Sequence, residues 1–295
     1  MISLTGFSRR ESSALSHAFL IIPFAGVFIL LFWSTFLWMA QRFDAHDSFY
    51  SHGWLVPLAS AWLIRQRWQT LKSVRIAESF WGLLLLVPSL ISHVVAAQLN
   101  LHLISGLAML VTLWGLVWVL YGWHALWTLR FPLLFLLFMV PLPGVLLIST
   151  SFKMKMTAAF LATHAIHLMG IAVQQAGSTI QAPGVSVIVD DTCSGLRSLI
   201  SLIALSVLWT ALMPTTAKRW QKWTVVACSI PIALSANMVR IVVLVLLSVI
   251  YGPQIAEGFI HYGSGIVVFG VALAILAWLS NRLIAVSHSV DPQGV

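Results

Sequence analysis

The chain has 295 residues, of which 60% are apolar and only 8% are charged, and its formal net charge is +8. An average soluble domain is about a quarter charged and under half apolar, so this composition excludes a soluble globular protein, a disordered chain and a nucleic-acid-binding domain. The basic residues stand in short clusters between long apolar runs, which is how a multi-spanning membrane protein is oriented. The composition therefore predicts an all-α integral membrane protein.

Apolar runs whose length is close to that of a transmembrane helix recur along the whole chain. A helix needs about 20 apolar residues to cross a bilayer. We expect eight transmembrane helices, at residues 18–40, 53–68, 80–97, 103–121, 125–140, 196–213, 223–250 and 263–283. The second run is short, and the last residues, 287–295, are expected to form a disordered tail.

The stretch 144–173 is ambiguous because basic and titratable side chains interrupt its apolar residues. These side chains are Lys153, Lys155, His164 and His167. The stretch is either a ninth span or an amphipathic helix lying in the membrane interface. With eight spans the basic loops at 65–75 and 218–222 both fall in the cytoplasm, whereas a ninth span would place them on opposite faces. We therefore expect an interfacial helix on the outer face and both termini in the cytoplasm.

A polar loop follows this stretch. Residues 174–192 read QQAGSTIQAPGVSVIVDDT, with polar and apolar residues alternating from Ser186 to Val189. Pro183 and Gly184 form a turn signal before that alternation. The loop is predicted to form a small β-hairpin on the outer face.

The most unusual polar segment is DDTCSGLRS, at residues 190–198. Asp or Thr is expected to cap an apolar helix, which places Cys193 in the first turn, where the helix dipole stabilises a thiolate. Arg197, one turn later, would add to this effect, and Asp190 and Asp191 would oppose it. A capped helix start with a buried structural cysteine is the alternative interpretation.

Arg240 lies inside a long apolar run together with Asn237. A charged residue at mid-helix costs about 2.5–3.5 kcal/mol on insertion scales and usually faces a bundle interior or a cavity. His261 lies at the outer start of the last run, where a merely solvated histidine is also common. Together with Cys193, the set supplies a thiol, a proton-exchanging group and a cation that can steady an oxyanion.

Other polar residues point to supporting roles. His52, in the segment YSHGW, is expected to be structural or to contact substrate. His164 and His167 have no nearby Asp, Glu or Cys companions, so no metal site is expected. No cofactor is expected, because the chain has no glycine-rich phosphate loop and no HExxH or GxSxG motif.

Five segments, taken in order, resemble the exosortase/archaeosortase family of membrane-embedded cysteine transpeptidase-like enzymes. They are YSHGWLVPL, FPLLFLLFMVPLPG, DDTCSGLRSL, NMVRIVVL and HYGSG. The resemblance implies that Cys193 is the nucleophile and His261 the general acid/base. It implies that Arg240 is either the oxyanion partner or the partner of a substrate carboxylate. Supporting or substrate-binding roles are expected for Asp191, Arg197, Asn237 and His52.

The resemblance also implies a function and a location. The expected substrates are exported proteins with a C-terminal Pro-Glu-Pro-like motif, a transmembrane helix and a basic cluster, processed through a Cys thioester in bacteria that make exopolysaccharide. The expected site lies on the periplasmic face of the bacterial inner membrane, and the acceptor is unknown. Two alternatives are a non-enzymatic transporter or scaffold for a lipid-linked glycan, and an intramembrane protease that only hydrolyses.

Overall fold

The computed structural model describes residues 23–45, 48–74, 77–190, 194–252 and 259–290, with the backbone alone described at 259–262 and 286–290. Within these ranges the secondary structure is helical apart from one small sheet. The chain divides into two compact units. The first comprises Met1–Arg42 and Ser73–Trp127, and the second comprises Phe43–Lys72 and Thr128–Val295.

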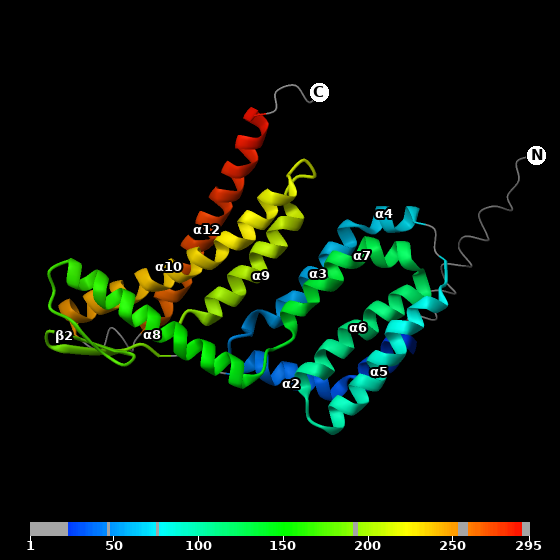
Figure 1. Cartoon of the computed structure of the whole chain (residues 1–295), viewed down its shortest axis with the longest axis horizontal. Coiled ribbons are helices and arrows are strands. Elements are labelled where there is room, and N and C mark those ends of the chain that lie inside the picture. Colours follow the sequence, from blue (N-terminus) through cyan, green and yellow to red (C-terminus); the bar gives the residue numbers. More distant parts are fainter. Residues whose placement is uncertain (1–22, 46–47, 75–76, 191–193, 253–258, 291–295) are drawn as a thin grey trace, which may run out of the picture. The chain divides into compact units, whose positions relative to one another are not determined.

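The first unit contains a bent helix and a helical hairpin (Figure 1). The bent helix consists of Pro23–Leu31 and α2 (Trp33–Asp44), and the helix axis bends by 66° between them. The hairpin consists of α5 (Leu83–Gln98), preceded by the 3₁₀ turn η2 (Phe80–Gly82), and α6 (His102–Tyr121). Gly115 lets these helices approach closely, because a Cβ there would lie 2.8 Å from the Leu86 backbone nitrogen.

A buried chain of hydrogen bonds ties the bent helix to this hairpin. Where the helix breaks at Phe32, the Leu31 carbonyl accepts a hydrogen bond from His93 Nε2 at 3.1 Å. In the neutral imidazole, Nδ1 then accepts from Ser105 Oγ at 2.9 Å, and Ser105 Oγ in turn accepts from Thr35 Oγ1 at 2.6 Å. The helix bend therefore frees a backbone carbonyl, and His93 satisfies it in an apolar surrounding where an unpaired carbonyl is costly.

Replacing this histidine is expected to destabilise the protein. His93→Leu leaves the Leu31 carbonyl and Ser105 without their partner, so we expect the free energy of unfolding to fall by about 1–2 kcal/mol. His102→Leu is the matched control, because His102 is an exposed histidine on the next helix and only stacks on Trp38. Thermal melting in detergent measures both variants, and an equal fall would contradict the role given to His93.

The second unit begins with the 3₁₀ turn η1 (Ser51–Trp54), α3 (Leu55–Gln66) and α4 (Trp68–Ser73). Of these, η1 and α3 pack against the turn η3 (Leu136–Met139), which follows α7 (Trp123–Phe135). Ser60 donates to the Pro132 carbonyl at 2.9 Å. Because Pro132 has no N–H, the helix cannot bond the Thr128 carbonyl one turn earlier, and Arg67 donates to that carbonyl at 3.5 Å.

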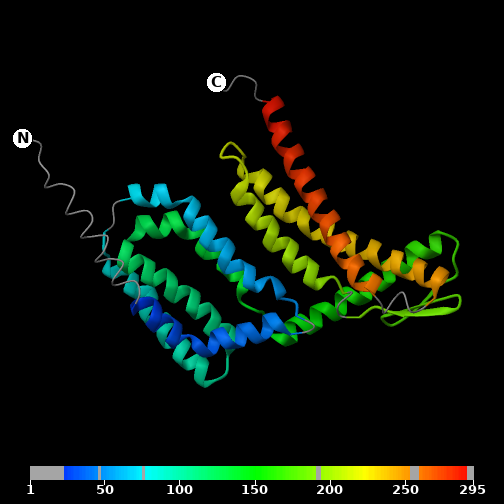
Figure 2. The same cartoon turned by 180° about the vertical axis from the view of Figure 1, so that it is seen from behind.

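Three helices of the second unit form a bundle, seen from behind in Figure 2. They are α9 (Leu196–Leu212), α10 (Arg219–Tyr251) and α12 (Phe259–Val290). Their shared core includes Leu202, Val225 and Leu276, all fully buried. Trp209 Nε1 donates to Ser280 Oγ at 3.1 Å, which adds a polar link between α9 and α12.

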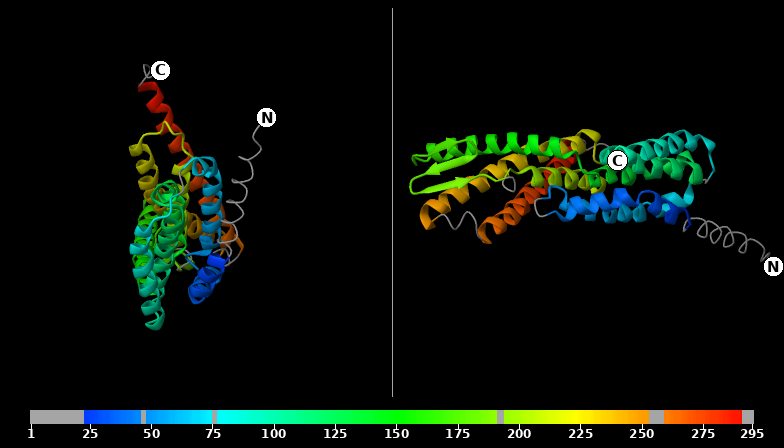
Figure 3. Two further views of the ribbon diagram at one scale, coloured as in Figure 1. Left: turned by 90° about the vertical axis from the view of Figure 1, so that its right-hand side faces the viewer. Right: turned by 90° about the horizontal axis from the view of Figure 1, so that it is seen from below.

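A three-stranded antiparallel sheet lies beside α8 (Gly144–Leu168) and α10 (Figure 3). Its strands are β1 (Gln174–Ala176), β2 (Thr179–Ala182) and β3 (Val185–Ile188). In β3, Val185 and Val187 are buried while Ser186 and Ile188 are exposed, so the alternation in the sequence marks the packed face. The expected hairpin is present, and β1 adds a third strand to it.

Every expected apolar run contains helix, but the count of eight membrane spans is not confirmed. Among the described residues five helices are long and apolar enough to cross a membrane, or six if the bent pair counts as one span. Helices α3, α7 and α9 have only 12 to 17 residues. Helix α8 is one of the five helices that are long and apolar enough to cross a membrane, so its placement in the membrane interface stays a prediction. Helix α12 continues to Val290, inside the segment expected to be a disordered tail.

Candidate functional site

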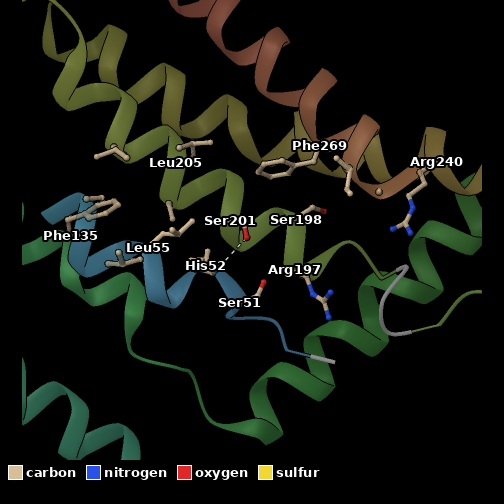
Figure 4. Close-up of a pocket in the computed structure, with 16 residues that line it drawn as sticks. Ser51, His52, Leu55, Phe135, Arg197, Ser198, Ser201, Leu205, Arg240 and Phe269 are labelled. Carbon is tan, nitrogen blue, oxygen red and sulfur yellow. Dashed lines mark hydrogen bonds between the residues drawn. The ribbon is translucent and has the colours of Figure 1, made fainter. Parts of the chain in front are cut away.

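A cavity of about 680 Å³ lies in the second unit, between η1, α3, α9, α10 and α12. Its lining is polarised, as Figure 4 shows. Arg197 and Arg240 lie toward one end, and apolar side chains that include Leu55, Phe135 and Leu205 lie toward the other. The volume is within the usual range of ligand pockets, which are mostly apolar with a few placed polar groups. The cavity is therefore the candidate site.

The start of α9 is fixed against α10 by a glycine. Gly195 is the N-cap residue of α9 and has φ +80°, a conformation that side chains other than glycine rarely adopt. A Cβ at this position would lie only 2.7 Å from Asn237 Cγ. Asn237 is buried and stands three residues before Arg240, which is one turn of the same helix. The chain just before α9 is thus held one turn away from Arg240.

The structure corrects one expectation about this helix start. Helix α9 begins at Leu196, and its N-cap is Gly195 rather than Asp or Thr. Glycine suits this position because the backbone there is left-handed. Cys193 lies outside the described residues, so its place relative to the helix dipole and to Arg197 stays a prediction.

Arg240 is held by two neighbours on α12. Its Nε donates a hydrogen bond to Ser264 Oγ at 3.2 Å. Its guanidinium lies against Gly265, where an added Cβ would be 3.4 Å from both Cζ and one Nη. A small residue at position 265 therefore leaves room for the guanidinium beside the α12 backbone. Arg240 faces the cavity inside the bundle, as the cost of a mid-helix charge predicts.

Arg197 enters the same cavity from the second residue of α9. Its Nε is buried and has no hydrogen-bond partner among the residues that the structure describes. A cation in the first turn of a helix is also opposed by the positive end of the helix dipole. Arg197 therefore stands where an anion would be stabilised strongly.

His52 comes from η1 and reaches α9. Its Nδ1 lies 3.1 Å from Ser201 Oγ, and its ring stacks on Tyr50 with centroids 5.6 Å apart. Burial lowers the pKa of His52 below the usual value of 6.5, and the Phe138 backbone partly offsets this shift. Its Nε2 is buried without a hydrogen bond from the rest of the described chain. His52 is thus a neutral, polar group in the cavity wall.

The structure brings together four of the seven residues expected at the site. Arg197, Arg240 and His52 line the cavity, and Asn237 lies beside Arg240. Cys193 and Asp191 lie outside the described residues. Position 261 is in α12, three and four residues before Ser264 and Gly265, and the side chain of His261 is not among those described.

Several residues in and beside the cavity were not expected from the sequence. Ser201 and Gly265 line it, where Ser201 pairs with His52 and Gly265 lies against Arg240, and Ser264 next to Gly265 accepts a hydrogen bond from Arg240. Ser201 stands four residues after Arg197, so helical spacing alone could have placed it on the same face. Gly195 carried no signal of its own beyond its place beside the helix start.

Metal binding is not indicated by the described part of the chain. No group of three His, Cys, Asp or Glu side chains within those ranges is placed to hold an ion. The expectation of a site without metal or cofactor stays a prediction.

Among the described residues, five helices, or six with the bent pair, are long and apolar enough to cross a membrane, which indicates a multi-pass membrane protein. Residues 38–278 match the family model described as transmembrane exosortase (Exosortase_EpsH). The match covers well over half of the chain, so the chain belongs to the transmembrane exosortase family, as the sequence motifs predict. No curated protein and no solved structure matches the chain significantly.

A side chain at position 195 is expected to disturb the start of α9. Gly195→Ala adds backbone strain of about 1–2 kcal/mol from the positive φ and a steric conflict with Asn237. Gly184→Ala is the matched control, because Gly184 has φ +76° but no atom within 4 Å of its Cβ position. Thermal melting should show the larger loss for Gly195→Ala, part of which Asn237→Ala restores. Equal losses at both glycines would mean that the contact with Asn237 is unimportant.

The lowered pKa of His52 predicts a pH-dependent stability. The folded state favours the neutral imidazole, so His52 costs nothing above about pH 6.5, and stability falls as the pH drops below that value toward the folded-state pKa. His52→Asn removes this dependence. The variant should lose less melting temperature than the parent between pH 7.5 and 5.5, and parallel pH profiles would show that His52 does not titrate as expected.

Proposed function

We propose that this exosortase-family protein is a cysteine peptidase/transpeptidase that cleaves and sorts exported proteins in the bacterial inner membrane. Cys193 is the nucleophile, His261 the general acid/base and Arg240 the cation at the reacting carbonyl. The proposed substrates carry a C-terminal Pro-Glu-Pro-like motif, a transmembrane helix and a basic cluster. The site faces the periplasm, and both termini lie in the cytoplasm.

The proposed reaction proceeds in two balanced steps. The Cys193 thiolate attacks the scissile carbonyl carbon, and Arg240 stabilises the negative charge that develops on the carbonyl oxygen. The intermediate collapses to a thioester as the C–N bond breaks, and the leaving nitrogen takes a proton from His261. An amine, a hydroxyl or water then gives a proton to His261 and attacks the thioester, which releases the thiolate.

The observation that supports this proposal is the way in which α9 and α12 meet at Arg240. Gly195, two residues after Cys193 in the sequence, packs on Asn237, one turn from Arg240. Ser264 and Gly265, one turn after His261, hold the guanidinium of the same arginine. The segments that follow Cys193 and His261 therefore meet the same turn of α10, which carries Asn237 and Arg240.

A membrane-embedded site suits a substrate that has its own membrane helix. When enzyme and substrate share one bilayer, their encounter is a two-dimensional search, and the substrate motif is pre-oriented by its anchor. The cavity wall supplies apolar side chains for such a segment, among them Leu55, Phe135 and Phe269.

The cysteine chemistry is tested by removing the thiol. Cys193→Ala is expected to abolish processing of a tagged substrate in cells while leaving expression and melting temperature unchanged. Cys228→Ala is the matched control, because Cys228 is the free cysteine that the structure describes, on α10 and absent from the cavity lining, and its loss should leave processing intact. Processing that survives Cys193→Ala would favour a non-enzymatic transporter or scaffold.

The covalent intermediate provides a second measurement. A substrate trapped on the enzyme should be released by hydroxylamine at neutral pH, as expected for a thioester, and should be absent from Cys193→Ala. Failure to detect it together with intact cleavage would favour simple hydrolysis over acyl transfer.

A further inference from the structure

We propose that Arg197 forms a carboxylate-binding subsite separate from Arg240, and that it binds the acidic side chain of the peptide substrate. The inference rests on the proposed function for the identity of the ligand. It divides the two arginines between two tasks: Arg197 selects the substrate, and Arg240 serves the carbonyl that reacts.

The charge of the cavity calls for an anion. Two guanidinium groups line it, and no acidic side chain is among its lining residues in the described part of the chain. A charge in apolar surroundings is costly unless it is paired, and the buried Nε of Arg197 has no hydrogen bond within the described ranges. A ligand carboxylate beside Arg197 removes this cost.

The two arginines differ in how they are held. Arg240 is oriented by Ser264 and Gly265, which suits a group that must meet a reacting atom in fixed geometry. Arg197 has a buried Nε with no hydrogen bond within the described ranges. Buried polar atoms in native proteins are nearly always satisfied, so the vacant donor indicates a partner supplied by the ligand. A guanidinium binds a carboxylate through two parallel hydrogen bonds, and Nε can supply one of them.

The position of Arg197 reinforces this assignment. It is the second residue of α9, so a carboxylate bound to it also lies at the positive end of the helix dipole. The buried Nε2 of His52, on the same cavity wall, provides a further polar contact for the ligand. The position that is unfavourable for a cation alone therefore becomes favourable for a cation paired with an anion.

The remaining wall defines what carries the carboxylate. Leu55, Phe135 and Leu205 lie away from the two arginines in Figure 4, so a ligand that fills the cavity has an acidic group joined to an apolar body. Arg240 in the same cavity is assigned to a peptide carbonyl. The ligand that meets both conditions is an Asp or Glu side chain in an otherwise apolar peptide segment, close to the scissile bond.

The proposal is tested by a double-mutant cycle for binding. The full chain carrying Cys193→Ala, in phosphatidylcholine nanodiscs, is titrated with a substrate peptide whose motif contains Glu or its isosteric replacement Gln. We expect Glu→Gln to weaken binding by about 10- to 100-fold, as for the loss of a charge-assisted hydrogen bond. Arg197→Gln should weaken binding of the Glu peptide by the same factor and leave the Gln peptide unchanged.

Arg240→Gln is the matched control. In the chain that keeps Cys193 it should lower the processing rate of both peptides. In the Cys193→Ala chain its effect on affinity should not depend on whether the peptide carries Glu or Gln. The proposal is overturned if the effect of the Glu-to-Gln change on affinity depends on Arg240 and not on Arg197. It is also overturned if the loss of affinity from Arg197→Gln is the same for the Glu peptide and the Gln peptide.

One further variant and one further lipid composition complete the test. Arg197→Lys retains the charge but loses the bidentate geometry, so it should bind the Glu peptide with intermediate affinity even if Arg197→Gln folds poorly. Repeating the titrations with phosphatidylglycerol added to the nanodiscs identifies a lipid phosphate as the competing occupant. An affinity that tracks this lipid and ignores the peptide charge would overturn the proposal.

The outcomes for the two proposals are distinguishable. Binding is measured on the chain that lacks the Cys193 thiol, so coupling between Arg197 and the peptide Glu can appear whether or not Cys193 performs chemistry. Processing that survives Cys193→Ala would end the proposed function and leave the subsite standing. Intact cysteine chemistry without coupling between Arg197 and the peptide Glu would end the proposed subsite and leave the proposed function standing.

Discussion

The architecture around the cavity depends on one contact, the packing of Gly195 against Asn237. This contact fixes where α9 begins. The left-handed backbone at Gly195 cannot continue the helix toward the N-terminus, and the absence of a side chain lets the Gly195 backbone touch α10. The same turn of α10 carries Arg240, whose guanidinium rests on α12 at Gly265. Three helices that are separated in the sequence are thereby brought together within a few residues.

Buried polar groups in this chain follow two patterns. In the first unit, His93, Ser105 and Thr35 satisfy one another and the Leu31 carbonyl, so they form a closed structural network. In the cavity, Arg197 and His52 each keep a buried nitrogen without a hydrogen bond among the described residues. The first pattern stabilises the fold, whereas the second leaves hydrogen-bonding capacity for a ligand.

The sequence predicted the helices better than it predicted their relation to a membrane. Apolar length locates helices such as α5, α6 and α10 to within a few residues, because an apolar helix is specified locally. The bend of the first helix at Phe32 coincides with contacts that His93 makes with Phe32 and the Leu31 carbonyl. Helices α3, α7 and α9 are shorter than a membrane span, so the count of eight spans was not confirmed, although each predicted run contains helix.

The sequence by itself determined the class of protein, the family and the set of unusual polar residues, because charge is so rare in this chain that Arg197 and Arg240 stand out. Only the tertiary structure decided that both arginines face one cavity, that His52 lines the same cavity and pairs with Ser201, and that α9 starts at Leu196. The pair of His52 and Ser201 joins residues 149 positions apart, and no local pattern encodes such a contact.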